Sequence, residues 1–318
     1  MANSISKIPV QIFADYIVEK LRKANPFLAF AVDESAKVLG GSVVHIPQSG
    51  AAPTTVKNRS TFPATAVKRE DSFVTYALNV FSTDPTHVSW HEENEVSYDK
   101  TDSVLGDHVE TLAEAVGDDM IYSWLQGYKT DGKTPDTIPA ANVVYTTGAS
   151  RATVEEGQTG NRKKITVADV QKIAVKFNKK NVAKQNRYLM LESNMYQELI
   201  ESLSDNQMAA FQGTANLAEG IMGKLCGFNV LERSSVCNFT KDGAPKLPGE
   251  AMAATDCIGG IAWQKDCVAK AIGDTKPFQD NDNPLYYGDV FSALVKSGGR
   301  CRRADWAGVA AIVEGTVA

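Results

Sequence analysis

The fold of this chain is decided by residues Tyr98–Tyr128, which read YDKTDSVLGDHVETLAEAVGDDMIYSWLQGY. Apolar residues recur there at steps of three or four, so on a helix they form one stripe: Leu105, Val109, Leu112, Val116, Met120 and Trp124. Asp99 and Ser103 are candidate caps for the start, and Gly127 stands where a terminating glycine is common. A helix from Ser103 to Gln126 would be about 36 Å long, which is long for a globular domain.

The other sides of this predicted helix are acidic. Neither Lys nor Arg occurs between Lys100 and Lys129, and six carboxylates lie in the stretch: Asp102, Asp107, Glu110, Glu114, Asp118 and Asp119. The apolar stripe predicts packing against a core on one side, and the acids indicate a solvent-facing surface on the other.

Length and composition limit the class of protein. The 318 residues suffice for one large domain or two ordinary ones, and 43% hydrophobic with 22% charged residues is typical of a folded protein. A net charge of −5 argues against nucleic-acid binding through phosphate contacts. No apolar run approaches the ~20 residues of a membrane span, and Met1–Val10 lacks the pattern of a secretory signal. The five cysteines, all in the last third, indicate a reducing cytoplasm rather than a disulfide framework.

The first third predicts an arm and a long hairpin. A short helix with Phe13, Ile17 and Leu21 on one face is too small to fold alone. Two strands follow, Ser42–Pro47 and Phe73–Phe81, separated by about 25 polar residues. A compact domain rarely carries a loop longer than about 12–15 residues, so we expect an arm that reaches away from its own body.

The rest of the chain predicts a mixed arrangement. We interpret 129–164 as loop with one possible strand at Asn142–Thr146. Thr166 and Asp169 have the spacing of a capping box. Strands and short elements follow without strict alternation, which indicates an α+β fold: Arg187–Leu191, a helix from Ser193 to Leu203, Leu225–Leu231, Ile258–Trp263, Cys267–Ile272, and, on either side of Gly298-Gly299, Val290–Val295 and Val309–Val313.

A histidine cluster is the most ligand-like feature. His87 and His91 are four residues apart, and Glu92, Glu93 and Glu95 follow. On a helix both histidines would face one way, as at some zinc sites. Pro85, Val88 and Trp90 disfavour a helix, and the H-E-x-x-H pattern is missing. A polar strand end is therefore the favoured interpretation, and a metal-dependent hydrolase stays as a remote alternative.

The remaining motifs do not indicate chemistry. The segment Gly220–Leu225 resembles a phosphate loop, but Leu225 stands where a magnesium-binding hydroxyl is needed. We interpret one basic stretch as a solvated helix face: Lys172, Lys176, Lys179, Lys180 and Lys184. For Arg300, Arg302 and Arg303, ion pairing at a subunit contact is a fair alternative. We predict no enzyme activity, no cofactor and no metal.

Six stretches carry a resemblance to a known family, in the right order along most of the chain: Gly41–Pro47, Glu95–Trp124, Arg187–Ser193, Gly223–Val230, Gly298–Asp305 and Val309–Ile312. The first four resemble the entry to an extended loop, a spine helix, a strand followed by a short helix, and a glycine signature. The last two resemble the closing segment. The family is the major capsid protein of tailed bacteriophages, whose Hong Kong 97-like fold is shared with encapsulins.

The resemblance implies a division of the chain into five segments. Residues 1–40 would be an N-terminal arm and 41–81 the extended loop. A peripheral domain would cover 82–164, with the spine helix at about 100–127. Most of an axial domain would cover 165–256, and C-terminal strands in 257–318 would complete both domains.

The resemblance also implies a function. The chain would be a structural subunit that forms pentamers and hexamers of an icosahedral shell around double-stranded DNA, bound without sequence specificity. Portal, scaffolding and decoration proteins would be partners, without a membrane; the virion would be the location and the host cytoplasm the place of assembly. Because capsid-like sequence begins within ten residues of Met1, we expect scaffolding to be a separate protein. An encapsulin-like compartment with an enzyme cargo is the alternative.

Two groups of residues become candidate sites under this resemblance. The extended loop offers inter-subunit contacts: Lys57, Arg59, Lys68, Arg69, Glu70 and Asp71. Some family members cross-link a loop lysine to a neighbour, but no partner for Lys57 or Lys68 can be matched. The acidic side of the spine helix is hypothesised to face the lumen and repel DNA phosphates: Asp107, Glu110, Glu114 and Asp118.

Overall fold

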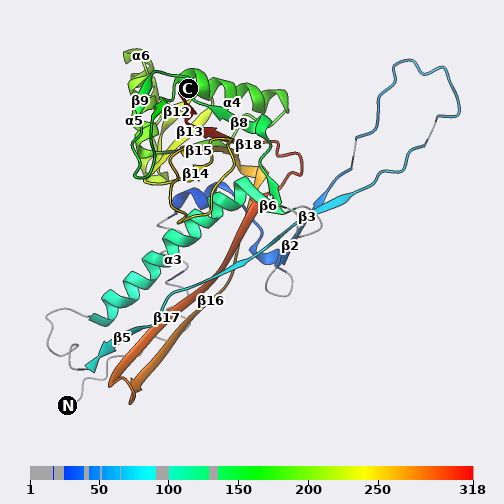
Figure 1. Ribbon diagram of the computed structural model, residues 1–318. Coiled ribbons are helices and arrows are strands. Elements are labelled where there is room, and N and C mark those ends of the chain that lie inside the picture. Colours follow the sequence, from blue (N-terminus) through cyan, green and yellow to red (C-terminus); the bar gives the residue numbers. More distant parts are fainter. Residues whose placement is uncertain are drawn as a thin grey trace.

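The computed structural model describes residues 17, 25–38, 43–50, 52–64, 66–90, 100–128 and 135–317 (Figure 1). Most of the predicted arm helix, the candidate cap Asp99, and His91 with its neighbouring glutamates lie outside these residues. Of the arm residues, Ile17 is fully buried in the largest apolar cluster. In the described part of the chain no helix has the length and hydropathy needed to cross a membrane.

The predicted long helix is present as α3, Lys100–Leu125. Its apolar stripe is buried, with Val116, Met120 and Trp124 fully enclosed. These side chains share one cluster with Val295 and other residues of the sheet beneath. The helix ends at Leu125, one residue before the predicted Gln126, and Gly127 lies in the short strand β6, Gln126–Tyr128.

A long antiparallel hairpin lies under α3 (Figure 1). Its strands are β16, Val268–Asn283, and β17, Gly288–Cys301. The sequence predicted short elements ending before Gly298-Gly299, and that prediction is wrong because both glycines lie inside β17. A Cβ on Gly298 would lie 2.7 Å from the carbonyl oxygen of Ala77, and one on Gly299 would overlap Met120 of α3. Glycine permits this close approach of backbone and helix to the strand.

The hairpin is the centre of a five-stranded sheet with the order β1-β16-β17-β4, in which β5 also pairs with β17. The added strands are β1, Val32–Asp33; β4, Asn79–Ser82; and β5, Thr86–Ser89. The single strand predicted at Phe73–Phe81 is therefore two strands. They separate at Leu78, because β3, Ser72–Ala77, pairs with β2, whereas β4 pairs with β17.

The extended loop is carried by a two-stranded ribbon. Strand β2, Val43–Gln48, pairs with β3 in antiparallel register from Val43↔Ala77 to Gln48↔Ser72. The described residues between the strands contain neither helix nor strand. In Figure 1 this segment reaches far from the body, on the side opposite to the tip of the β16–β17 hairpin.

The second body is built on a seven-stranded sheet with the order β12-β13-β11-β15-β18-β8, in which β14 pairs with β15. The strands are β8, Val143–Tyr145; β11, Arg187–Glu192; β12, Ile221–Leu225; β13, Phe228–Arg233; β14, Cys237–Phe239; β15, Cys257–Gln264; and β18, Val309–Val313. Its helices are α4, Val167–Lys179; α5, Ser193–Glu201; and α6, Asp205–Gln212. The predicted capping box at Thr166 and Asp169 is present at the start of α4.

The region predicted as loop, 129–164, contains more structure than expected in its described part. Besides β8 it holds β7, Pro135–Thr137; η3, Ala140–Asn142; β9, Ser150–Ala152; and β10, Asn161–Lys163. Strand β7 pairs with β6, and a small sheet has the order β19-β10-β9, with β19 at Gly315–Thr316. These strands are three residues or shorter and polar, so no alternation of apolar residues marks them.

One short segment joins the two bodies. In η1, Pro26–Phe30, Phe27 contacts Trp124 of α3 edge-on, with ring centroids 5.8 Å apart. Phe30 stacks at 4.2 Å on Tyr188 of β11. The other 3₁₀ turns are η2, Ser35–Lys37; η4, Leu217–Glu219; and η5, Lys265–Cys267.

Candidate assembly surfaces

The extended loop is a basic projection with exposed apolar residues. Four bases and no acid occur between 49 and 69: Lys57, Arg59, Lys68 and Arg69. All four are exposed. Val56, Phe62 and Val67 are also exposed, by 53%, 75% and 86%. These exposed apolar residues make the projection a candidate contact surface.

The six predicted contact residues of the loop are all exposed, but they do not form one group. Asp71 accepts hydrogen bonds from Gly50 N (2.7 Å) and Arg69 Nε (2.6 Å), and these two contacts lower the pKa of its carboxyl. The bond from Gly50 to Asp71 joins the two ends of the loop, and Arg69 pairs with the same carboxylate. Within the described part of the chain, Lys57, Arg59 and Lys68 form no ion pair, so they remain available for a partner.

The acidic residues of α3 also fall into two groups, those that are exposed and those with a partner in the chain. Asp107, Glu110 and Glu114 are exposed. Asp118 instead forms an ion pair with Arg233 of β13, and Asp119 accepts hydrogen bonds of 3.1 and 3.2 Å from Asn79 Nδ2. Burial raises the pKa of Asp119. The exposed acidic stripe is therefore shorter than the sequence suggested.

The tip of the β16–β17 hairpin is an aromatic surface that the sequence analysis missed. Leu285, Tyr286 and Tyr287 are exposed by 82%, 54% and 83%. Strand β5 supports them, because His87 lies 5.7 Å from the Tyr286 ring and Trp90 N donates to Tyr287 O at 3.1 Å. The available signal was three large side chains in a row, Leu285, Tyr286 and Tyr287, directly after Pro284.

Of the predicted histidine cluster, only His87 is among the described residues; in that part of the chain no group of three or more His, Cys, Asp or Glu side chains could hold an ion. His87 lies in β5 against Tyr286, as a polar strand residue. In the segment resembling a phosphate loop, Gly220 ends η4 with a φ of 72°, and Gly223 lies in β12 against Phe211. The backbone there pairs with β13.

The predicted solvated face at α4 is present for four of its five lysines: Lys172, Lys179, Lys180 and Lys184 are exposed, and Lys176 is half-buried. Lys172 pairs with Asp169 at 2.7 Å. Lys176 Nζ donates to Ala141 O and Val143 O, at 2.6 and 2.9 Å, and burial lowers its pKa. Lys180 likewise donates to Asn142 and Asp305. Lys176 and Lys180 thus connect the C-terminal end of the helix to neighbouring chain segments, and only Lys176 departs from the predicted exposure.

The three arginines near the C-terminus form contacts within the chain rather than only at a surface. Arg300 is buried and donates to Thr75 O and Asp136, Arg302 lies 3.3 Å from the buried Glu34, and Arg303 pairs with Asp305 at the surface. The cysteines are free thiols, and Cys257, Cys267 and Cys301 are buried as small apolar residues.

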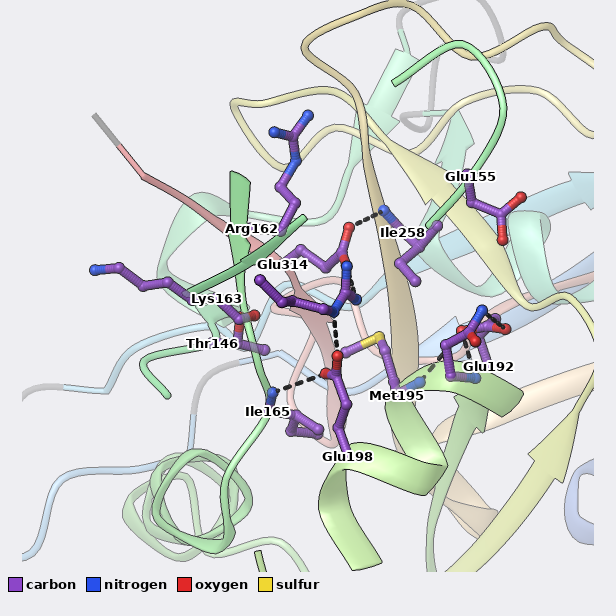
Figure 2. Close-up of polar contacts among 12 residues, drawn as sticks. Thr146, Glu155, Arg162, Lys163, Ile165, Glu192, Met195, Glu198, Ile258 and Glu314 are labelled. Atoms are coloured by element: carbon purple, nitrogen blue, oxygen red, sulfur yellow. Dashed lines mark hydrogen bonds and ion pairs between the residues drawn. The ribbon is translucent and has the colours of Figure 1, made fainter. Parts of the chain in front are cut away.

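A buried charge cluster holds the second body together (Figure 2). Arg151 of β9 forms ion pairs with Glu198 of α5 and with Glu314, the residue before β19. The second oxygen of each carboxylate accepts a backbone hydrogen bond, from Ile165 N at 3.2 Å and from Ile258 N at 3.0 Å, as Figure 2 shows. Sequence reasoning missed this cluster because its partners are far apart in the chain.

No family model matches this chain, and no curated protein sequence matches it. Several solved structures match this chain. The capsid of cyanophage Pam1 has a TM-score of 0.62 at 10% identity, over 92% of this chain and 93% of that one. The capsid of Ralstonia phage GP4 gives 0.60 at 14% identity, covering 91% and 88%, and that of cyanophage P-SCSP1u gives 0.58 at 17%, covering 91% and 86%. The predicted α+β architecture is confirmed: this chain has the Hong Kong 97-like fold of tailed-phage capsid subunits.

Proposed function

We propose that this protein is the major capsid protein of a tailed phage and assembles into an icosahedral shell. The observation that carries the proposal is the likeness to phage capsids over about nine-tenths of this chain and of each matched chain. Coverage this high cannot come from one of the two compact bodies alone.

The two projections support self-assembly. The extended loop and the hairpin tip lie at opposite ends of the molecule in Figure 1, and both expose apolar side chains. Surfaces that differ in this way make head-to-tail contacts between copies, and such contacts close into rings when the rotation permits. Pentamers and hexamers are such rings. The loop bases Lys57, Arg59 and Lys68 favour an acidic surface on the neighbour.

The acidic stripe of α3 fits the lumen of a DNA-filled shell. Asp107, Glu110 and Glu114 are exposed along one helix without a base between Lys100 and Lys129. Carboxylates repel phosphates, so the packaged duplex would slide along this surface rather than bind to it. Asp118 is not part of this role, because Arg233 neutralises it.

Assembly tests the proposal directly. Purified protein, with its scaffolding partner where assembly requires one, should sediment as pentamers, hexamers or shells and appear as closed particles by negative-stain microscopy. A monomer that persists at high concentration with that partner present would contradict the proposal. DNA inside particles from infected cells supports a virion, whereas one abundant enzyme inside them would favour the encapsulin-like alternative. Portal, scaffolding and decoration proteins are the further partners of this proposal, and the host cytoplasm is the proposed place of assembly.

A further inference from the structure

The β2–β3 ribbon, which carries the extended loop, packs on a face of the β16–β17 hairpin that consists mainly of small residues. In the β16–β17 register Ala269 pairs with Arg300 and Ala271 with Gly298, so these four residues share one face of the hairpin. The β2–β3 ribbon packs on this face through an apolar cluster that includes both alanines. A Cβ on Gly298 would lie 2.7 Å from Ala77 O, so the ribbon backbone rests directly on the strand.

Arg300 is the one long side chain among these four residues. It is 3% exposed, and its Nη1 donates to Thr75 O in β3 at 2.9 Å. Its Nη2 donates to Asp136 Oδ2 in β7 at 2.7 Å. A Cβ on Gly127 of β6 would lie 3.0 Å from the guanidinium carbon, so the β6–β7 hairpin closes over the group. One side chain therefore joins β17, the loop ribbon and a second hairpin.

These contacts fix a direction that the apolar packing alone leaves open. Burial of apolar side chains is non-directional, so it keeps the ribbon on the hairpin without fixing the angle between the two. A planar guanidinium that donates to two fixed acceptors does set an angle. A second fixed point lies on β2, the other strand of the ribbon, where Gln48 Nε2 donates to Arg302 O at 2.6 Å. Two such points, one on each strand, define the line of the ribbon.

We propose that Arg300 is a positioning residue for assembly: it sets the direction in which the extended loop leaves the body, and thereby the angle between neighbouring subunits in the shell. Asp136 orients the guanidinium and balances its charge, and Gly127 leaves room for it. The part of the proposal that concerns the shell rests on the proposed function, whereas the part that concerns the ribbon does not.

The test compares Arg300→Gln and Arg300→Lys with the control Arg303→Gln, which changes an exposed arginine three residues away. Amide hydrogen exchange is measured on the unassembled subunit, and particle diameters are measured after assembly. In both Arg300 variants, exchange in 43–48 and 72–77 should accelerate on the order of tenfold, as expected for the loss of a charge-assisted hydrogen bond. Exchange in β11 and β15 should not change, and the diameters should become broadly distributed.

Two milder variants keep the test decisive if Arg300→Gln does not fold. Gly127→Ala displaces the guanidinium without removing its charge, and Asp136→Asn weakens its second acceptor; each should shift ribbon exchange and diameters in the same direction. Lysine should not rescue, because its ammonium is a point charge without the planar fork of a guanidinium. Wild-type ribbon exchange and a single particle diameter in all these variants would overturn the proposal. Wild-type protein that forms no shell would overturn the proposed function instead, and the exchange result would still decide whether Arg300 holds the ribbon.

Discussion

The second body and the two projections differ in whether their charged side chains have partners within the chain and in how far their apolar side chains are exposed. In the body, Arg151 is enclosed with two carboxylates, and Lys176 and Lys180 donate to backbone carbonyls of neighbouring segments. On the extended loop, Lys57 and Lys68 are exposed, as are Phe62 and Val67. The buried charges of this cluster are thus paired within the chain, whereas the projections present charged and apolar groups to solvent or to another molecule. Substitutions in the two regions should therefore separate folding from assembly.

The largest expected effect on folding lies in the buried cluster. Replacing Arg151 by Met removes the one cation between Glu198 and Glu314, which are 7% and 1% exposed. Breaking a buried ion pair by removing one partner costs about 3–5 kcal/mol, because uncompensated charge remains inside. Urea unfolding of the unassembled subunit measures this loss. The triple change that also replaces both glutamates by Gln should recover part of the stability, and a loss below about 1 kcal/mol for Arg151→Met would contradict a buried, paired cluster.

The projections should show the reverse pattern. Replacing Phe62 and Tyr287 by Ser removes two exposed rings, so the free energy of unfolding should stay within about 0.5 kcal/mol of wild type. Burial of one such side chain in an interface contributes about 1.5–3 kcal/mol, so the concentration at which shells form should rise at least tenfold. Light scattering during assembly measures that concentration. Val175→Ser, on the exposed side of α4, is the matched control, and equal assembly by both proteins would remove these rings from the interface.

The same contrast explains which features could be predicted from the sequence. The stripe of α3 repeats over several turns, so its period alone located a long helix and the residues that it buries. The length of the polar segment after β2 predicted a projection, because compact domains do not carry such loops. Both signals are local. Prediction failed at Gly298 and Gly299, because what approaches those glycines comes from β3 and α3, which are distant in the chain.

The candidate sites show a second limit. Asp118 and Lys176 belong to runs of like charge and look solvent-exposed in the sequence, yet each has a partner in another element. The pair Arg151–Glu314 spans 163 positions and leaves no pattern at all. A run of like charge in this sequence therefore does not show which of its side chains have a partner in another element.

A smaller effect is expected at the start of α4. Burial alone would raise the pKa of Asp169, but hydrogen bonds from Lys172, Thr147 and Thr166 outweigh it and lower that pKa below 3.8. A carboxyl with a depressed folded-state pKa contributes stability above its unfolded pKa, and the contribution is lost as pH falls through the folded value. Asp169→Asn should cost about 1–2 kcal/mol at neutral pH and flatten the loss of stability below pH 3.8. Urea midpoints from pH 7 to pH 2 measure both, and an unchanged acid limb would refute the assignment.

The smallest effect on folding and assembly, and a specific effect on DNA, is expected at the exposed acids of α3. Glu110→Lys with Glu114→Lys should change the free energy of unfolding by no more than about 0.5 kcal/mol, because both side chains are exposed. Shell formation should also be unchanged. Packaged DNA length or release rate should fall, since lysines attract the phosphates that the acids repel. Glu219→Lys, an exposed acid of the second body, is the control. Wild-type DNA handling in the helix variant would show that this stripe does not face the genome, and would leave α3 with the single task of backing the β16–β17 sheet.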